Sequence, residues 1–173
     1  MTAKPLLDSL RGGDRRSIGR ANAVAAEAAA DPRKLAVLVE GLMDADPVVR
    51  MRAADALEKA TAAVPTRLDP HKQHLIALAA EARQQELRWH LAQMLPRLSL
   101  TLAERGRATA ILRGYLDDRS AIVKTCALQG LADLAATDTA LRAELTRLLR
   151  HYAKAGTPAM RARCRKLLAR SYT

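Results

Sequence analysis

The sequence predicts an all-α protein, a helical solenoid of about five repeated hairpins, from two observations. Equivalent apolar positions recur at spacings of 38, 36 and 37 residues along the 173-residue chain, at Val49, Leu87, Val123 and Met160. A leucine stands eight residues after each of them. In addition, no segment shows the apolar–polar alternation of a strand, whereas apolar residues at helical spacing within a period of this size are typical of helical repeats.

Each unit is expected to contain two helices joined by a short turn, and the units together form one domain. Their predicted spans are about 4–30, 31–64, 69–99, 101–136 and 138–172. The first unit is degenerate, with a turn at 12–14 and a helix through Ser17 to Ala28. In the second unit Asp31 is expected to cap the first helix, because Pro32 after it suits the first helical position. Residues 44–47 then turn the chain into a helix that runs to about Ala63.

The later units follow the same plan. The third is predicted to place helices near 70–82 and 86–98, and Pro96 should bend or end the second of these, since proline removes a backbone donor and crowds the preceding turn. The fourth has helices near 102–116 and up to about 136, with a turn at 117–120. The fifth begins near Asp138, turns at 156–158 and ends with a helix over 160–171.

One segment of the second unit resembles a known family. From Asp46 to Leu57 the chain reads Asp-Pro-Val-Val-Arg-x-x-Ala-x-x-Ala-Leu, which resembles the second helix of a HEAT repeat. The later units follow this pattern more loosely and are somewhat compact, but the resemblance covers nearly the whole chain. It implies a right-handed α-α superhelix of the armadillo-like class. HEAT-like arrays serve as scaffolds, adaptors, nucleic-acid binders and occasionally enzymes, so the resemblance specifies the fold much more than the activity.

The composition favours a small helical protein of the cytoplasm. Hydrophobic residues make up 49% of the chain but aromatic residues only 2%, with no Phe, so the core must consist of Leu, Val, Ile and Ala. We expect neither secretion nor a membrane-spanning helix, because the first residues form no continuous apolar stretch and no apolar run approaches the length of about 18 residues that a span needs. Cys126 and Cys164 are expected to be buried, reduced thiols, with a disulfide or redox role as the alternative.

One column of the repeat is wholly basic, because Arg50, Arg88, Lys124 and Arg161 each follow a reference apolar residue. These cations could form a stripe that binds phosphate. They could instead form a structural ladder, in which they pair with acidic residues of the turns, and the HEAT resemblance implies this ladder. The second-unit turn offers Asp44 and Asp46 and the fourth-unit turn offers Asp117 and Asp118, whereas the third and fifth units have no matching acid. Arg88 and Arg161 must therefore pair with a neighbouring unit or remain solvated.

The second helix of each unit is expected to line the concave surface of the array. Positions two, five, six and nine after the reference residue point away from the predicted core at about 100° per residue. This face is largely small and apolar in the middle units, with the only Trp near its centre. We therefore predict a groove for a partner helix or peptide, unless the Trp packs into the adjacent unit instead. The predicted groove residues are Met51, Asp55, Trp89, Gln93, Leu128 and Gln129.

The net charge of +11 is concentrated near the C-terminal end. Residues 139–173 carry nine basic side chains and one acidic side chain, whereas residues 21–138 carry equal numbers of both. This excess suggests an anion-binding patch for nucleic acid or an acidic protein. A polar end cap is the alternative, because nothing stacks on the last unit. The candidate patch consists of Arg161, Arg163, Arg165, Lys166 and Arg170.

The sequence predicts no catalytic site, no metal site and no cofactor. His71 and His74 share a helix face, but no third ligand is near them, and no nucleophile–base pair or phosphate-binding loop is present. HEAT-like DNA glycosylases and lyases share the fold, yet no residues here support either activity. We expect a non-catalytic protein-interaction scaffold, with a nucleic-acid-binding module as the alternative and an enzyme as a distant third. No membrane contact is expected, and the oligomeric state stays open.

Overall fold

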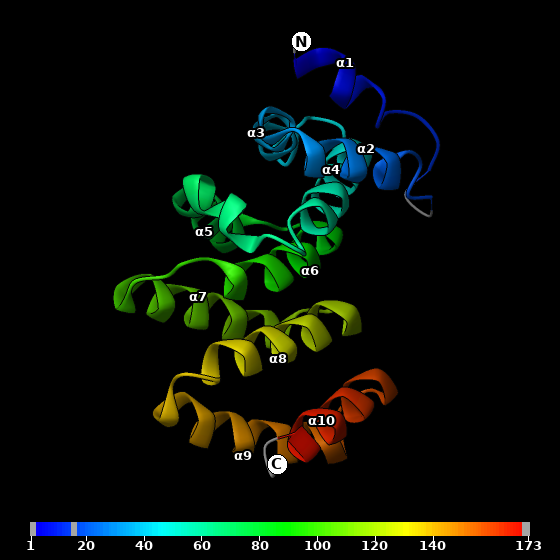
Figure 1. Cartoon of the computed structure of the whole chain (residues 1–173). Coiled ribbons are helices and arrows are strands. Elements are labelled where there is room, and N and C mark those ends of the chain that lie inside the picture. Colours follow the sequence, from blue (N-terminus) through cyan, green and yellow to red (C-terminus); the bar gives the residue numbers. More distant parts are fainter. Residues whose placement is uncertain (1–2, 15–16, 171–173) are drawn as a thin grey trace.

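The computed structural model describes residues 3–14 and 17–170, and it arranges them as paired helices that follow one another from α1 at one end to α10 at the other (Figure 1). These residues contain no strand, which confirms the predicted all-α class. The α-helices are α1 (Ala3–Asp8), α2 (Ala21–Ala30), α3 (Pro32–Gly41), α4 (Pro47–Ala60), α5 (Lys72–Glu81), α6 (Gln85–Met94), α7 (Leu102–Gly114), α8 (Ala121–Ala135), α9 (Thr139–Ala155) and α10 (Pro158–Arg170). Short 3-10 helices occupy Pro65–His71 (η1), Leu95–Arg97 (η2) and Tyr115–Asp117 (η3).

The even-numbered helices form a continuous row in chain order. Helix α2 packs on α4, α4 on α6, α6 on α8, and α8 on α10. The odd-numbered helices lie beside them, with α1 packed on α3, α5 on α7, and α9 on both α8 and α10. Within the later pairs, α3 packs on α4, α5 on α6, and α7 on α8.

The core between the helices is aliphatic, as the composition requires. The reference residues Val49, Leu87, Val123 and Met160 are at most 4% exposed. Gly130 allows α8 to approach α6 closely, since a Cβ at this position would lie 2.7 Å from the carbonyl oxygen of Ala92 and 3.0 Å from Leu112 Cδ1. Close contact of this kind needs small residues along the row, which explains why alanine is so frequent in the even-numbered helices.

The helix boundaries follow local chemistry. Asp31 and Asp46 cap α3 and α4 by accepting hydrogen bonds from the backbone N–H groups of Arg33 (3.1 Å) and Val48 (2.8 Å), with proline at the first helical position in both cases. Of the two outcomes expected for Pro96, the structure has the early stop, because α6 ends at Met94 and Pro96 lies within η2. Helix α2 begins at Ala21, later than predicted, since Gly19 has a φ of +51°, which a right-handed helix does not admit.

A buried arginine holds the first unit in place. Arg52 on α4 is 3% exposed, and its guanidinium donates hydrogen bonds to the carbonyl oxygens of Leu10 (2.7 Å), Gly12 (2.7 Å), Asp14 (3.2 Å) and Ser17 (3.1 Å). The planar fork of an arginine has five N–H donors, so a loop that wraps around it can satisfy nearly all of them. Arg52 therefore fixes the segment between α1 and α2 against the row of even-numbered helices.

A capping box begins α7 and links it to α5. The Thr101 hydroxyl accepts a hydrogen bond from the backbone N–H of Glu104 (3.3 Å), and the Glu104 carboxylate accepts one from the backbone N–H of Thr101 (2.7 Å). The same carboxylate accepts hydrogen bonds from Lys72 Nζ (3.0 Å) and from the Gln73 side chain. The Thr101 backbone N–H, followed by the Lys72 ammonium, lowers the pKa of Glu104 to about 2.

This shift predicts a specific dependence of stability on pH. A carboxyl group whose pKa is lowered by folding stabilises the native state above its unfolded pKa of about 4.3, and this contribution is lost as the pH falls toward the folded value. We expect Glu104→Gln to lower the melting temperature by a few degrees near neutral pH. The difference from the wild type should shrink below about pH 4 and disappear near pH 2, as followed by circular dichroism. Glu81→Gln, which changes an exposed carboxylate at the end of α5, is the control. A deficit of Glu104→Gln that is the same at every pH would contradict this assignment.

Candidate partner-binding surface

All of the predicted groove residues lie on the even-numbered helices, but the prediction is wrong for Leu128. Ala54, Ala92 and Leu128, five positions after their reference residues, are each 0% exposed. Leu128 therefore belongs to the core and cannot line a groove. The reason is that each middle helix of the row is covered by a neighbouring helix on both sides. Its buried face is therefore wider than the apolar positions of the repeat indicate. The small apolar residues that indicated a groove are the contact between adjacent helices.

Trp89 nevertheless lines an open cavity of about 270 Å³ on this face, together with Met51 and Asp55 of α4. Two further lining residues, Ser17 and Ile18, come from the loop that Arg52 holds. Ile18 is 46% exposed, which is unusual for a large aliphatic side chain and was not predicted from the sequence. The cavity thus joins the first, second and third units, with mostly apolar walls. Gln93 lies outside it, and its side chain donates to the carbonyl oxygen of Trp89 (3.3 Å).

One wall of the Trp89 cavity is polar and buried. Asp55 accepts a hydrogen bond from Lys59 Nζ (2.7 Å), and its other oxygen lies 3.8 Å from His90 Nε2. Burial lowers the pKa of His90, and the nearby charges of Asp55 and Glu58 oppose this effect, so His90 is neutral near pH 7. Within the described part of the chain, His90 Nδ1 is buried and has no hydrogen-bond partner.

The polar residues of this cavity do not form a catalytic triad, although a serine, a histidine and an aspartate all line it. The Asp55–His90 separation of 3.8 Å is too long for a hydrogen bond. Asp55 is engaged by Lys59, and Ser17 Oγ accepts the backbone N–H of Gly19 (3.1 Å). The arrangement can hold an apolar group against Trp89 and offer it a polar edge, but it lacks an activated nucleophile.

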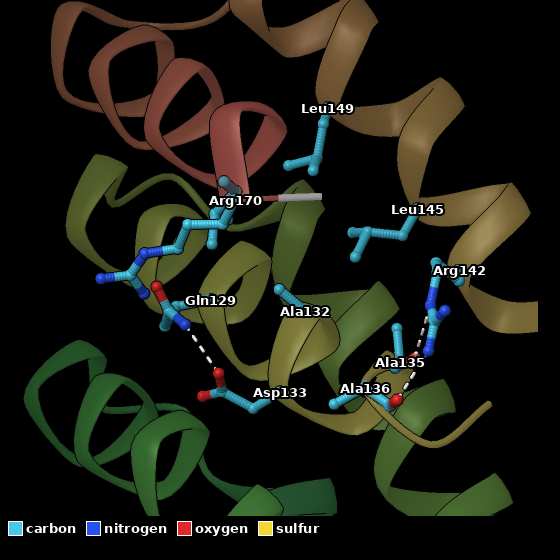
Figure 2. Close-up of a pocket in the computed structure, with 10 residues that line it drawn as sticks. Gln129, Ala132, Asp133, Ala135, Ala136, Arg142, Leu145, Leu149 and Arg170 are labelled. Atoms are coloured by element: carbon cyan, nitrogen blue, oxygen red, sulfur yellow. Dashed lines mark hydrogen bonds between the residues drawn. The ribbon is translucent and has the colours of Figure 1, made fainter. Parts of the chain in front are cut away.

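A second cavity, of about 410 Å³, lies between α8, α9 and α10 (Figure 2). Leu145 and Leu149 of α9 point into it, and Ala132 of α8 lies near its centre. Arg142 and Arg170 stand at opposite edges. The sequence did not reveal this cavity, because it depends on how far the last unit stands from α8. The only related sequence feature is that Leu145 and Leu149 lie four residues apart, close to Arg142.

The rim of the second cavity is polar. Arg142 donates from Nη2 to the carbonyl oxygen of Ala136 (2.6 Å) and from Nε to that of Ala135 (3.3 Å), which caps the end of α8. Gln129, a predicted groove residue, belongs to this rim rather than to the Trp89 cavity, and it donates to Asp133 (2.7 Å). Burial raises the pKa of Asp133, while the Gln129 hydrogen bond and the nearby arginines, including Arg170, act in the opposite direction.

The predicted basic patch divides into two groups on α10. At about 100° per residue, Arg161 and Arg165 lie on one side of the helix, and Arg163, Lys166 and Arg170 lie on the other. Arg163 is half-buried and donates to Gln129 Oε1 (2.9 Å), whereas the other four are exposed. The charge excess therefore surrounds the second cavity and the outer face of α10 instead of forming one stripe.

The basic column makes contacts between units where a partner is within reach. Arg50 donates to Gln84 Oε1 of the following unit (2.8 Å) and to the carbonyl oxygen of Asp44 (2.7 Å). Arg88 pairs with Asp118 of the following unit (2.5 Å) and lies over the ring of Tyr115 at 5.2 Å. Among the described residues, the side chains of Lys124 and Arg161 have no hydrogen-bond or ion-pair partner. The ladder thus stays a prediction for Lys124, and the phosphate stripe is not favoured for Arg50 or Arg88, whose donors are engaged.

Other reactive groups do not gather into a site. The residues that the structure describes contain no group of three or more His, Cys, Asp or Glu side chains able to hold a metal ion. Cys126 and Cys164 are free thiols, and burial raises the pKa of both. None of the described helices is long and apolar enough to cross a membrane.

Comparisons with known proteins inform only on the fold. No protein family and no curated protein matches the sequence. A structural match is the crystal structure of an engineered protein, with a TM-score of 0.59 and 18% sequence identity. The match covers 96% of this chain and 78% of that one. At this identity the similarity extends to the arrangement of helices, and it carries no information on binding or activity.

Proposed function

We propose that the chain is a HEAT-like α-solenoid that works as a non-catalytic interaction module, binding a partner helix or peptide on the face of its even-numbered helices. The continuous row of these helices and the contacts of Arg50 and Arg88 between units support the repeat architecture. The observation that carries the functional proposal is the cavity of about 270 Å³ that Trp89 lines with Met51 and the exposed Ile18.

The size and chemistry of this cavity favour one apolar side chain as its occupant. Ligand pockets for drug-sized molecules occupy roughly 300–1,000 Å³, so this cavity lies just below that range. Tryptophan is enriched among the residues that dominate binding energy at interfaces, where it sits in a desolvated pocket. The buried His90 and the Asp55–Lys59 pair add a polar edge that can fix the orientation of a peptide backbone.

Substitution of Trp89 tests this function. A random peptide library displayed on phage is selected on the purified chain, and the enriched peptides are measured by fluorescence anisotropy. We expect Trp89→Ala to weaken the binding of at least one class of these peptides by at least about 30-fold, the loss typical of a hot-spot residue. Gln93→Ala, one turn further along α6 and outside the cavity, should leave binding unchanged. If Trp89→Ala alters the binding of no enriched peptide, the Trp89 cavity is not the binding site.

Nucleic-acid binding is the second candidate function, and the exposed basic residues of α10 favour it. Four of the five candidate side chains face solvent on either side of this helix. Four neutralised phosphates would give a slope of about −3.6 in a plot of log affinity against log salt concentration for duplex DNA. This candidate predicts that replacing Arg161, Arg165 and Lys166 with Gln removes most of that slope. A duplex that fails to bind at low salt would exclude it.

A further inference from the structure

The cavity between α8, α9 and α10 shares no lining residue with the Trp89 cavity. Its lining is apolar at the centre, where Ala132, Leu145, Leu149 and Leu167 meet, and charged at two edges. At about 410 Å³ it is within the range of typical ligand pockets, about 300–1,000 Å³, and is large enough for an aliphatic side chain with part of its backbone.

The charges around this cavity indicate which kind of ligand it favours. Arg142 and Arg170 line the cavity and Arg163 donates to Gln129 at its rim, whereas α9 and α10 carry a single acidic side chain, Glu144. Glu144 pairs with Arg113 of α7, on the other side of α9, so it does not offset the charge at the cavity. Asp133 is the acidic member of the rim, and it faces Arg163 and Arg170. The electrostatic field at the cavity is therefore positive, which favours an acidic ligand.

Arg142 has capacity left for such a ligand. Two of its guanidinium nitrogens hold the carbonyl oxygens at the end of α8, which fixes the side chain in place. Its Nη1 makes no hydrogen bond to any described residue, and a guanidinium has five N–H donors in total. A carboxylate placed over the cavity can accept from Nη1 without breaking the cap, and this fixed geometry lowers the entropic cost of binding.

We propose that this cavity is a second binding site, which accepts an aliphatic side chain of an acidic peptide segment while flanking carboxylates of the peptide pair with Arg142 and Arg170. The site lies on other helices than the Trp89 cavity, so it does not depend on the function proposed above. Nucleic acid fits the rim charge but not the aliphatic centre, because a phosphate backbone has no group that gains from burial among leucines.

A substitution that fills the cavity distinguishes binding in the cavity from attraction of an acidic peptide by surface charge alone. A displayed random peptide library is selected in parallel on the wild-type chain, on Ala132→Leu, which fills the cavity centre without changing charge, and on Ala143→Leu, which adds the same group to the exposed side of α9. We expect a class of peptides that is lost only on Ala132→Leu. Its members should combine Asp or Glu with Leu, Ile or Met, and bind Ala132→Leu at least about tenfold more weakly.

The charged rim provides a second test, which is independent of how well Ala132→Leu folds. Arg170→Gln should weaken the same peptides several-fold, whereas Arg147→Gln, an exposed charge on α9 away from the cavity, should have a much smaller effect. The proposal is overturned if no peptide class responds to Ala132→Leu, or if the responsive class lacks acidic residues. It is also overturned if a DNA duplex displaces the peptides and binds Ala132→Leu as tightly as the wild type. Peptides sensitive to Trp89→Ala form a separate class, so the two proposed sites can fail independently.

Discussion

The close packing of the even-numbered helices is the constraint on which the rest of the structure depends. Each helix of the row from α2 to α10 contacts the next, and Ala54, Ala92 and Leu128, five positions after the first three reference residues, are fully buried between them. Gly130 shows how tight this contact is, since even one methyl group there would overlap the carbonyl oxygen of Ala92. Larger side chains along the row would force the helices apart and change the spacing of every unit beyond them.

The two cavities lie where this regular packing is modified. At the N-terminal end, a loop fixed by the buried Arg52 replaces part of a regular helical hairpin and brings Ile18 next to Trp89. At the C-terminal end, α9 and α10 leave a cavity of about 410 Å³ against α8. A further cavity of about 280 Å³ separates α7 from α9. A hollow of about 750 Å³, lined mainly by polar residues such as Arg50, Arg88 and Asp118, also lies at the turns of the middle units.

The helices and most of the core could be predicted from the sequence, because both follow from local chemistry and periodicity. Asp31 caps its helix as its position before proline predicts, and the reference residues are buried as their spacing predicts. The burial of Leu128 was not predicted, because the width of the buried face depends on the helices on both sides. The burial of Arg52 was not predicted either, because it depends on a loop about 40 residues upstream. The cavity beside Arg142 could not be predicted, since no periodicity records the distance between two units. Of the groove, Trp89, Met51 and Asp55 do meet in one cavity, whereas Gln93 and Gln129 lie elsewhere.

Native-state hydrogen exchange, resolved by residue, tests the central role of the helix row most directly. In an array stabilised by contacts between neighbours, the helices covered on both sides open least often, and the ends open first. The slowest amides are therefore expected in α4, α6 and α8, with similar opening free energies. The amides of α9 and α10, which border the two cavities near the C-terminal end, should exchange considerably faster. Protection in α10 equal to that in α6, or slower exchange in the odd-numbered than in the even-numbered helices, would contradict it.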